Sequence, residues 1–400
     1  MHSKTNMKEL NTEYSSIKLC FLSHSSGIAG AEKAFPKLLK GLADKGIKIL
    51  VLLPEHGPVE DILKENNLEY EIVGYSRWIN GDSQYIRRIK RTVKNLIMTI
   101  PVMLTVKKHK CSLLYSNTST ILTGAIAAYF LRKQHVWHFR EFGIEDYGYF
   151  YDLGSKISQY LLDKLSTICL VNSFAVAKKY RKFIPAEKIR VLYESYHESE
   201  IFESNERSLV LSRELFQCVM IGTLHEAKGH IDAIRAISLL KSSEQRIVLN
   251  IIGTGDIGYK KFLLEEIKKN GIEREVQFWG YLNNPSDILR QSDVLLMCSK
   301  NEAYGLVTLE AMKLGKPVIG SQSGGTAELI EDGKTGLLYK PGNFEELSQK
   351  IHLLNLNKDL GIELGLNAKV RADTMFTPER YIEETISVLQ SLTNSNTLTS

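Results

Sequence analysis

The twenty residues from Asn301 to Gly320, NEAYGLVTLEAMKLGKPVIG, constrain the fold of this chain more than any other stretch. They follow an apolar run at Asp293–Cys298, pass a glycine at Gly305 and continue with a helical pattern. A second apolar run, Pro317–Ile319, follows this pattern. The order strand, turn, helix, strand is typical of an α/β domain.

Two carboxylates lie on either side of the predicted helix N-terminus. Glu302 falls in the turn, and Glu310 falls within the first two turns of the helix. A helix N-terminus offers free backbone N–H groups and a positive dipole end. Acceptor oxygens on both sides of such an anion site suit a nucleotide sugar, in which a diphosphate joins two groups that carry hydroxyls. Because two glutamates at this spacing also occur by chance, the spacing alone leaves a structural role open.

Residues 302–319, EAYGLVTLEAMKLGKPVI, resemble the signature segment of the family 4 retaining glycosyltransferases, the glycosyl transferases group 1. The resemblance implies the GT-B fold, an α/β architecture of two facing Rossmann-like domains with an interdomain cleft. It covers both halves of the chain and is specific mainly from Phe216 to Tyr339.

Composition is typical of a globular enzyme with two domains. The chain has 400 residues and a formal net charge of +5, which does not require nucleic acid as a partner. None of the five cysteines forms a C-x-x-C pair, and each lies in or beside an apolar run, as expected for reduced thiols in a cytoplasmic protein. Residues 1–16 lack the apolar core of a signal peptide, and the uncharged runs are too short or too broken for a membrane span.

Apolar runs and turn residues indicate the domain organisation. The runs predict strands at 17–23, 48–53, 68–73, 111–116, 135–139, 167–172, 189–192, 216–221, 246–252, 276–280, 293–298, 317–319 and 335–339. We expect an acceptor-binding domain at 1–200, a polar linker at 193–209 and a nucleotide-sugar-binding domain at 210–378. The resemblance implies that a helix at 379–392 crosses back to the first domain, and the polar residues 393–400 are expected to be disordered.

The first half offers a glycine loop and a cluster at a strand end. The loop HSSGIAGAEKAF contains Gly30, and backbone N–H groups there could bind phosphate or simply pack on the sheet. Its resemblance to the family's first glycine-rich loop implies a place near the donor.

The strand that ends HVWHFREFG carries His138, which the resemblance places beside the transferred sugar, although a histidine there is more often structural. We assign Arg140 and Glu141 to the acceptor side.

The second half carries the predicted donor site. By resemblance, Gly222 and Lys228 belong to a loop that neutralises the donor diphosphate, and Thr223 stands where the family usually has arginine. Tyr281 is expected beside the nucleobase. The glycines of Ser323–Thr326, at a helix start, would leave N–H groups open to phosphate. The remaining donor-binding candidates are Glu302, Tyr304, Gly305, Leu306 and Glu310.

The resemblance implies transfer of a sugar from a UDP- or GDP-linked donor with retention at the anomeric carbon. His138, Lys228 and Glu302 are the candidate catalytic residues. The sequence has no D-x-D in a suitable loop and no clustered metal ligands, so we expect no metal requirement. A glycan or lipid-linked acceptor, in surface polysaccharide assembly, is the expected partner.

Residues 85–110 combine basic side chains with apolar positions in a helical pattern. Such a helix can lie on an anionic membrane surface, which would make the protein peripheral on the inner face of the plasma membrane. The alternative is a helix packed on the sheet with a solvated basic face.

Three other functions remain open. A sugar-nucleotide epimerase or phosphorylase would use the same two-domain plan. A non-catalytic partner subunit of a transferase would bind donor without turnover, and Thr223 favours it slightly. A nicotinamide-dependent oxidoreductase is disfavoured because the glycine loop after the first strand, HSSGIAGAEKAF, is not a G-x-G-x-x-G.

Overall fold

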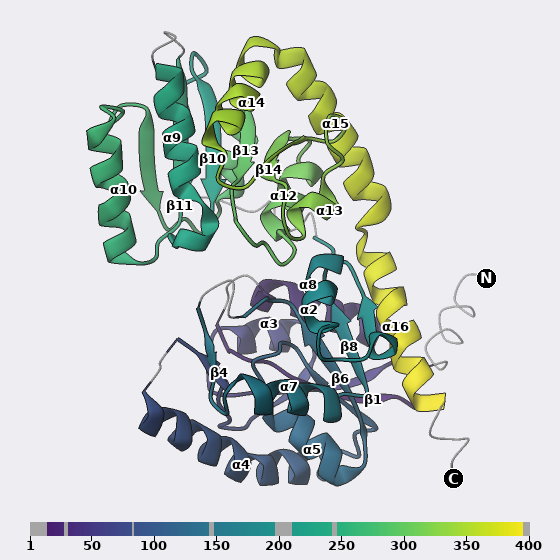
Figure 1. Ribbon diagram of the computed structural model, residues 1–400. Helices are drawn as coiled ribbons and strands as arrows, with labels where there is room; N and C mark the ends of the chain where they lie inside the picture. Colours follow the sequence, from purple (N-terminus) through teal and green to yellow (C-terminus); the bar gives the residue numbers. More distant parts are fainter. Residues whose placement is uncertain are drawn as a thin grey trace, which may run out of the picture. The chain divides into compact units, whose positions relative to one another are not determined.

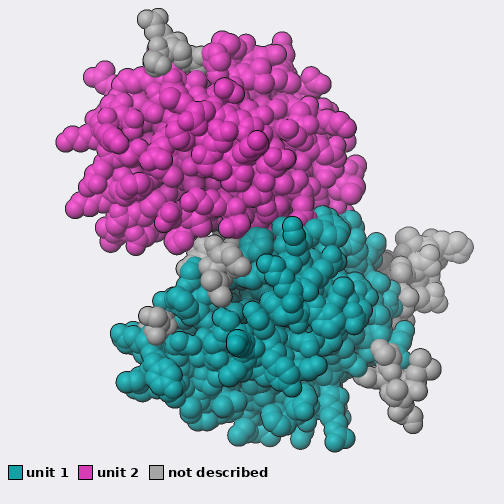
Figure 2. Space-filling view, in the orientation of Figure 1, with its two compact units in different colours: residues 1–194, 378–400 teal, residues 195–377 magenta. Residues whose placement is uncertain are grey.

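The computed structural model describes residues 14–27, 31–81, 84–143, 148–196, 210–241 and 246–394, without the side chains of residues 31–34. The chain divides into two compact units (Figure 2). Unit 1 comprises residues 1–194 and 378–400, and unit 2 comprises residues 195–377. The predicted linker lies mostly outside the described residues, since 197–209 are not described, and so does Gly30.

Unit 1 is built on a seven-stranded parallel sheet in the order β3-β2-β1-β5-β6-β8-β9 (Figure 1). Its strands are β1 (Lys18–Leu22), β2 (Lys48–Leu53), β3 (Glu69–Ile72), β5 (Leu113–Ser116), β6 (Gln134–Phe139), β8 (Ile168–Val171) and β9 (Ile189–Val191). A separate antiparallel pair is formed by β4 (Ile79–Asn80) and β7 (Phe150–Tyr151). The helices are α2 (Ala31–Asp44), α3 (Val59–Glu65), α4 (Tyr85–Lys108), α5 (Thr123–Leu131), α7 (Ser155–Lys164), α8 (Phe174–Tyr180), the short η1 (Ala186–Lys188) and α16 (Pro378–Asn394).

Unit 2 is built on a six-stranded parallel sheet in the order β12-β11-β10-β13-β14-β15. Its strands are β10 (Phe216–Ile221), β11 (Ile247–Ile252), β12 (Val276–Gly280), β13 (Val294–Met297), β14 (Val318–Ser321) and β15 (Leu337–Tyr339). The helices are η3 (Glu226–Lys228), α9 (His230–Lys241), α10 (Ile257–Lys269), α11 (Ser286–Gln291), α12 (Leu306–Lys313), α13 (Thr326–Leu329), α14 (Phe344–Leu356) and α15 (Lys358–Met375).

The predicted α/β class is confirmed, and each predicted strand is present to within two residues at either end. Central strands such as β2 (KILVLL) and β13 (VLLM) are continuous apolar runs because helices cover both faces of a parallel sheet. Ser173 caps α8 as predicted, since its side chain accepts a hydrogen bond from the Val176 N–H. Among the residues that the structure describes, no helix is both long enough and apolar enough to cross a membrane.

The last helix, α16, completes the core of unit 1. Tyr381, Ile386 and Leu389 belong to the same apolar cluster as the strands β1 and β2. Gly41 of α2 allows a close approach to α16, because a Cβ atom there would lie 2.2 Å from Ile382 Cδ1. The described helix runs to Asn394, so two residues that we expected to be disordered are helical.

A buried arginine ties β6 to this helix. Arg140 Nη2 donates to the Tyr381 hydroxyl at 3.1 Å, and Nη1 lies 3.5 Å from Glu194 Oε2. Both partners in the Arg140–Glu194 pair are buried. Burial is the largest single effect and opposes the charge on Arg140, but Glu194 together with Tyr381, Tyr115 and Glu141 outweighs it and raises the pKa of the guanidinium. This pair therefore links β6 to the end of the first segment of unit 1.

We expect Glu194→Ala to lower the free energy of unfolding of unit 1 by about 3–5 kcal/mol, because it leaves the buried Arg140 charge without its carboxylate. Urea unfolding followed by tryptophan fluorescence measures this loss, since two of the three tryptophans, Trp78 and Trp137, are buried in unit 1. The exposed Glu187→Ala is the control. Equal stability of the two variants would contradict a structural role for the pair.

Candidate active site

The loops that follow β10 and β13 meet where the strand order of unit 2 reverses. β10 is the first strand of this sheet; β11 and β12 lie on one side of it, and β13 pairs with it on the other. Open parallel sheets bind ligands at the carboxyl ends of the strands at such a reversal point. Lys228 lies in the loop after β10, and Glu302 lies in the loop after β13.

Lys228 and Glu302 are in direct contact at this point. Lys228 Nζ donates to Glu302 Oε2 at 2.9 Å, and the Ser299 hydroxyl donates to the same oxygen at 2.8 Å. The Lys228 side chain is 24% exposed and that of Glu302 15% exposed, so the pair lies at the surface of the unit but is partly shielded. It presents a cation beside an acceptor oxygen, the two groups needed for a phosphate and a sugar hydroxyl.

Backbone turns hold these residues in place. His225 caps η3 by accepting from the Ala227 N–H, and the Lys300 N–H donates to the Ala227 carbonyl at 2.9 Å. The loop that carries Lys228 is thereby tied to the loop that carries Glu302. On the other side, the Ser321 hydroxyl donates to the Ser299 carbonyl, which links β14 to the same loop.

Gly324 and Gly325 pack directly against the backbone at Glu302. Gly324 has φ +56°, and a Cβ atom there would lie 2.1 Å from the Glu302 carbonyl oxygen. The Gly325 N–H donates to that same oxygen at 2.7 Å. The expectation that the N–H groups at this helix start stay open to phosphate is therefore wrong for Gly325. These glycines instead permit the close packing that fixes Glu302.

The turn from Glu302 into α12 leaves a helix N-terminus beside the ion pair. Gly305 caps α12 in the left-handed conformation, without a side-chain capping bond. The first N–H groups of an α-helix have no partner within the helix, so those at the start of α12 can receive an anion. Thr308 is fully buried, and among the described residues its hydroxyl has no hydrogen-bond partner. Tyr304 is buried, and Leu306 is partly exposed.

Glu310 lies on α12 and is held by a residue that the sequence did not single out. It is 6% exposed, and its Oε1 accepts a hydrogen bond from the Ser286 hydroxyl at the start of α11. A carboxylate has about four acceptor sites, more than the Ser286 hydroxyl alone can fill. Ser286 orients the carboxylate through a contact across 24 residues of sequence.

The other donor candidates of unit 2 follow the ends of β10 and β12. Gly222 donates its N–H to the Ile252 carbonyl at 3.0 Å, and Thr223 is exposed. Tyr281 follows β12 directly and is 65% exposed, so its ring is open to a planar ligand. The structure places these residues on the same edge of the sheet as Lys228 and Glu302.

The candidates in unit 1 are already engaged: His138 and Arg140 are buried, and Glu141 is partly buried. His138 is fully buried, and its Nδ1 lies 2.7 Å from the Tyr115 hydroxyl. Burial, together with the charge of Arg140, holds the pKa of His138 well below its usual range, so the imidazole is neutral. Glu141 accepts from the Ser119 N–H at 2.7 Å, and burial raises the pKa of its carboxyl. With Arg140 paired to Glu194, all three side chains have structural contacts.

His138 nevertheless keeps one atom without a partner. Its Nε2 is buried and makes no hydrogen bond to any described residue. The predicted roles of His138, Arg140 and Glu141 toward substrate stay predictions.

No group of three or more His, Cys, Asp or Glu side chains that could hold a metal ion occurs in the described ranges. The expectation of a metal-independent site stays a prediction.

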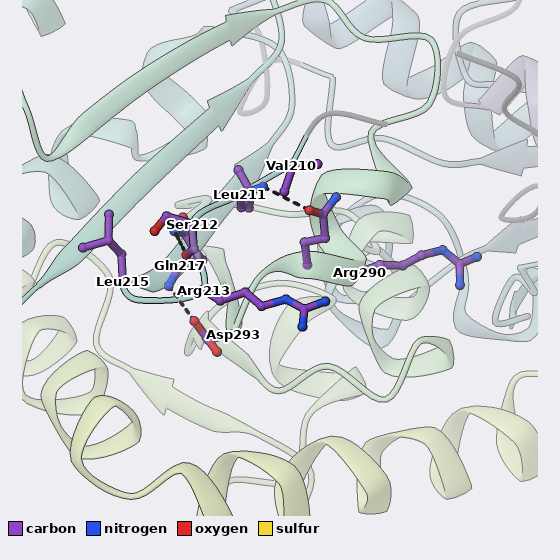
Figure 3. Close-up of a pocket in the computed structure, with 9 residues that line it drawn as sticks. Val210, Leu211, Ser212, Arg213, Leu215, Gln217, Arg290 and Asp293 are labelled. Carbon is purple, nitrogen blue, oxygen red and sulfur yellow. Dashed lines mark hydrogen bonds between the residues drawn. The ribbon is translucent and has the colours of Figure 1, made fainter. Parts of the chain in front are cut away.

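A cavity of about 510 Å³ opens at the opposite edge of the sheet (Figure 3). It lies where β10 and β13 begin, away from the loops that carry Lys228 and Glu302. Its lining contains none of the predicted site residues and consists of Val210, Leu211, Ser212, Arg213, Leu215, Gln217, Arg290, Gln291 and Asp293.

Residues 202–371 match the family model described as glycosyl transferases group 1. The chain is 24% identical over 236 residues to the N-acetyl-alpha-D-glucosaminyl L-malate synthase of Bacillus anthracis, covering 58% of this chain and 61% of that protein. It is 31% identical over 202 residues to the trehalose synthase of Thermococcus litoralis, covering 48% of each. The matched region thus spans about half to three fifths of these relatives.

Solved structures match over both units. The Anabaena protein HepE, in complex with UDP-glucose, has a TM-score of 0.76 at 23% identity, covering 94% of this chain and all of that one. The lipopolysaccharide outer core galactosyltransferase WaaB has a TM-score of 0.67 at 17% identity, covering 94% and 99%. These likenesses show that the chain has the GT-B-like fold. The resemblance to the glycosyl transferases group 1 is confirmed, and the family match lies within unit 2.

We expect Gly324→Ala to destabilise unit 2 more than Gly333→Ala does. Both glycines have a left-handed φ, +56° and +73°, but a Cβ atom at Gly333 would meet nothing within 4 Å. Gly333→Ala therefore reports backbone strain of about 1 kcal/mol, and Gly324→Ala adds the collision with Glu302, about 1–3 kcal/mol more. Thermal unfolding of the two variants measures the difference. Equal destabilisation would mean that the loop at Glu302 relaxes freely.

We expect the free energy of unfolding to fall as the pH drops below about 6.5, by about 1.4 kcal/mol per pH unit for each histidine that is buried in the neutral form. The sign follows because the unfolded chain binds a proton that folded His138 does not. His138→Asn should reduce this slope, whereas His56→Gln, whose side chain is 81% exposed, should not. Urea unfolding between pH 5 and pH 7 measures the slopes. An unchanged slope in His138→Asn would contradict the lowered pKa.

Proposed function

We propose that the protein is a retaining glycosyltransferase that moves a sugar from a nucleotide-diphosphate sugar to an acceptor hydroxyl. The observation that carries the proposal is the contact of Lys228 with Glu302 at the strand-order reversal of unit 2, beside the N-terminus of α12. A cation, a helix N-terminus and carboxylates occur there together. These are the groups that a diphosphate flanked by two sugars would need.

Each residue has a proposed role on the donor. Lys228 exchanges part of its contact with Glu302 for a contact with the diphosphate, and the first N–H groups of α12 bind the same charge. Glu302 then accepts hydrogen bonds from hydroxyls of the donor sugar. Glu310, oriented by Ser286, accepts from the ribose hydroxyls. Tyr281 lies beside the nucleobase. Gly222, Thr223 and the turn Tyr304–Leu306 line the sugar and the phosphates.

The chemical step forms one bond and breaks one. The acceptor oxygen bonds to the anomeric carbon while the bond from that carbon to the diphosphate oxygen breaks. The acceptor proton passes to an oxygen of the departing diphosphate, on the face from which it leaves. Stabilisation of the developing negative charge by Lys228 and α12 lowers the barrier, because fixed donors are most effective where charge develops. His138 of unit 1 is proposed to lie near the transferred sugar, and Arg140 and Glu141 near the acceptor.

UDP- and GDP-linked sugars are the proposed donors, and UDP-glucose is the first to test because the structurally similar HepE was solved with it. A glycan or lipid-linked acceptor of surface polysaccharide assembly is the proposed acceptor class. The similar WaaB, a galactosyltransferase of the lipopolysaccharide outer core, supports that class.

We expect calorimetry to show binding of UDP or GDP to the wild-type chain with EDTA present, and a 10- to 100-fold weaker Kd in Glu310→Gln. The size follows because a hydrogen bond to a charged group contributes about 1.5–3 kcal/mol. Glutamine keeps the shape of the side chain and an oxygen acceptor for Ser286. Glu363→Gln, at an exposed position on α15, is the matched control and should bind as wild type.

Hydrolysis of the donor or transfer to an added glycan then separates the proposal from its alternative. Binding with turnover supports the transferase. Binding without turnover over a panel of acceptors would favour the non-catalytic subunit, for which the exposed Thr223 at the usual arginine position is the motivating observation. If no nucleotide binds, the donor site itself is contradicted.

A further inference from the structure

Helix α4 has its apolar side chains on the side away from the protein. Seven aliphatic residues on this helix have exposed fractions between 45% and 68%. They recur every three or four residues and so follow one face of the helix. We call them the α4 stripe: Ile86, Ile89, Val93, Leu96, Ile97, Ile100 and Leu104.

The face of α4 that packs on unit 1 mixes polar and apolar residues, and Met98 and Met103 also pack against the core there. Its buried residues are Asn95, Thr99, Val102, Thr105 and Val106. A helix on the surface of a globular unit usually buries its apolar face and exposes its polar one. Here the larger apolar face is the exposed one, so burial in unit 1 cannot explain the α4 stripe.

Specific contacts fix the rotation of the helix about its axis. Asn95 Oδ1 accepts from the Ser76 N–H at 2.8 Å, and Arg91 Nη2 donates to the buried Asp152 at 2.6 Å. Arg88 donates to the Tyr151 carbonyl at 2.8 Å. These inward contacts hold the opposite face outward, so the exposure of the α4 stripe is a fixed feature of the unit.

Charge follows the α4 stripe along one flank. Residues 85–108 contain seven Lys and Arg residues and no Asp or Glu. Arg88 and Arg91 turn inward, whereas Arg87, Lys90 and Lys94 are exposed and, at a spacing of three and four, form one row. An apolar face beside a row of cations is complementary to anionic lipid headgroups above acyl chains.

The neighbouring helix adds two exposed rings. α5 packs beside α4 (Figure 1) and ends with Tyr129 and Phe130, which are 62% and 65% exposed and stack edge to face. The exposed Arg132 follows them. Aromatic rings next to basic side chains are enriched at the boundary between water and lipid.

We propose that the α4 stripe and its basic row dock unit 1 on the surface of an anionic lipid bilayer. The helix lies in the plane of the headgroups and does not cross the bilayer. The α4 stripe runs from Ile86 to Leu104, 18 residue steps or about 27 Å at 1.5 Å per residue, and it follows one face of the helix throughout. Docking needs no nucleotide sugar, so its failure and the failure of the proposed transferase activity are separate results.

The test is flotation of the full chain with vesicles of phosphatidylcholine alone, or of phosphatidylcholine mixed with phosphatidylglycerol, at low and high salt. We expect binding to the anionic vesicles, weakened by salt. Lys90→Gln with Lys94→Gln should lower the partition coefficient by about 25-fold, since each cation near the surface contributes about fivefold. Ile97→Ser with Ile100→Ser should lower it at least about tenfold.

The matched control is Leu366→Ser with Val370→Ser on α15. These residues are 58% and 64% exposed and also lie four apart, but Glu363 and Asp373 are near them on the same helix. This control should float as wild type. All these positions are exposed, so unchanged thermal unfolding should accompany each variant.

Three results would overturn the proposal. The first is no flotation with anionic vesicles. The second is equal loss of flotation in the α15 control. The third is a wild-type chain that forms a dimer by light scattering and does not bind vesicles, with the dimer lost in Ile97→Ser with Ile100→Ser. A second copy of the chain would then be the occupant of the α4 stripe.

Discussion

The candidate site of unit 2 depends on the close approach of two backbone turns, Gly324–Gly325 against Glu302–Tyr304. Without side chains at both glycines, the loop after β14 reaches the Glu302 carbonyl and holds it with an N–H donor. The Glu302 side chain is then positioned to meet Lys228 from the loop after β10. Three loops from three parallel strands thereby converge beside the start of α12. The position of the charged pair is thus set by backbone packing, and its chemistry is set by the side chains.

Much of the fold and part of the site could be predicted from the sequence, because both have local signals. Buried parallel strands are continuous apolar runs, and Glu302, Gly305 and Glu310 fall within one short segment. Ser286 and Ser299 could not be found this way. Ser286 reaches Glu310 across 24 residues of sequence, and Ser299 contacts Glu302 within one loop. An isolated serine carries no sequence pattern in either position. The pair β4 and β7 was also missed, because two-residue strands are too short for periodicity.

The charged candidate residues of the two units differ in their exposure to solvent and in their contacts. In unit 2, Lys228 and Glu302 lie at the edge of the sheet with partial exposure and a mutual contact that a ligand could share. In unit 1, Arg140 is buried against Glu194 and Tyr381, and the partly buried Glu141 accepts hydrogen bonds from Ser119. Sequence alone does not separate these cases, because Tyr381 is 241 residues away from its partner. A residue at a strand end can contribute to packing or to ligand binding. Its burial and its hydrogen bonds in the folded unit show which contacts it already makes.

The discontinuity of unit 1 has a consequence for the order in which the protein folds during synthesis. Unit 2 is one continuous segment, so its core is complete before the ribosome has translated α16. Unit 1 begins the chain, yet its apolar cluster includes Tyr381, Ile386 and Leu389 from the last helix. Unit 1 can therefore close only after unit 2 has been synthesised, and its surface for α16 stays exposed until that helix emerges. Premature termination before Pro378 would leave unit 2 intact while unit 1 lacks part of its core.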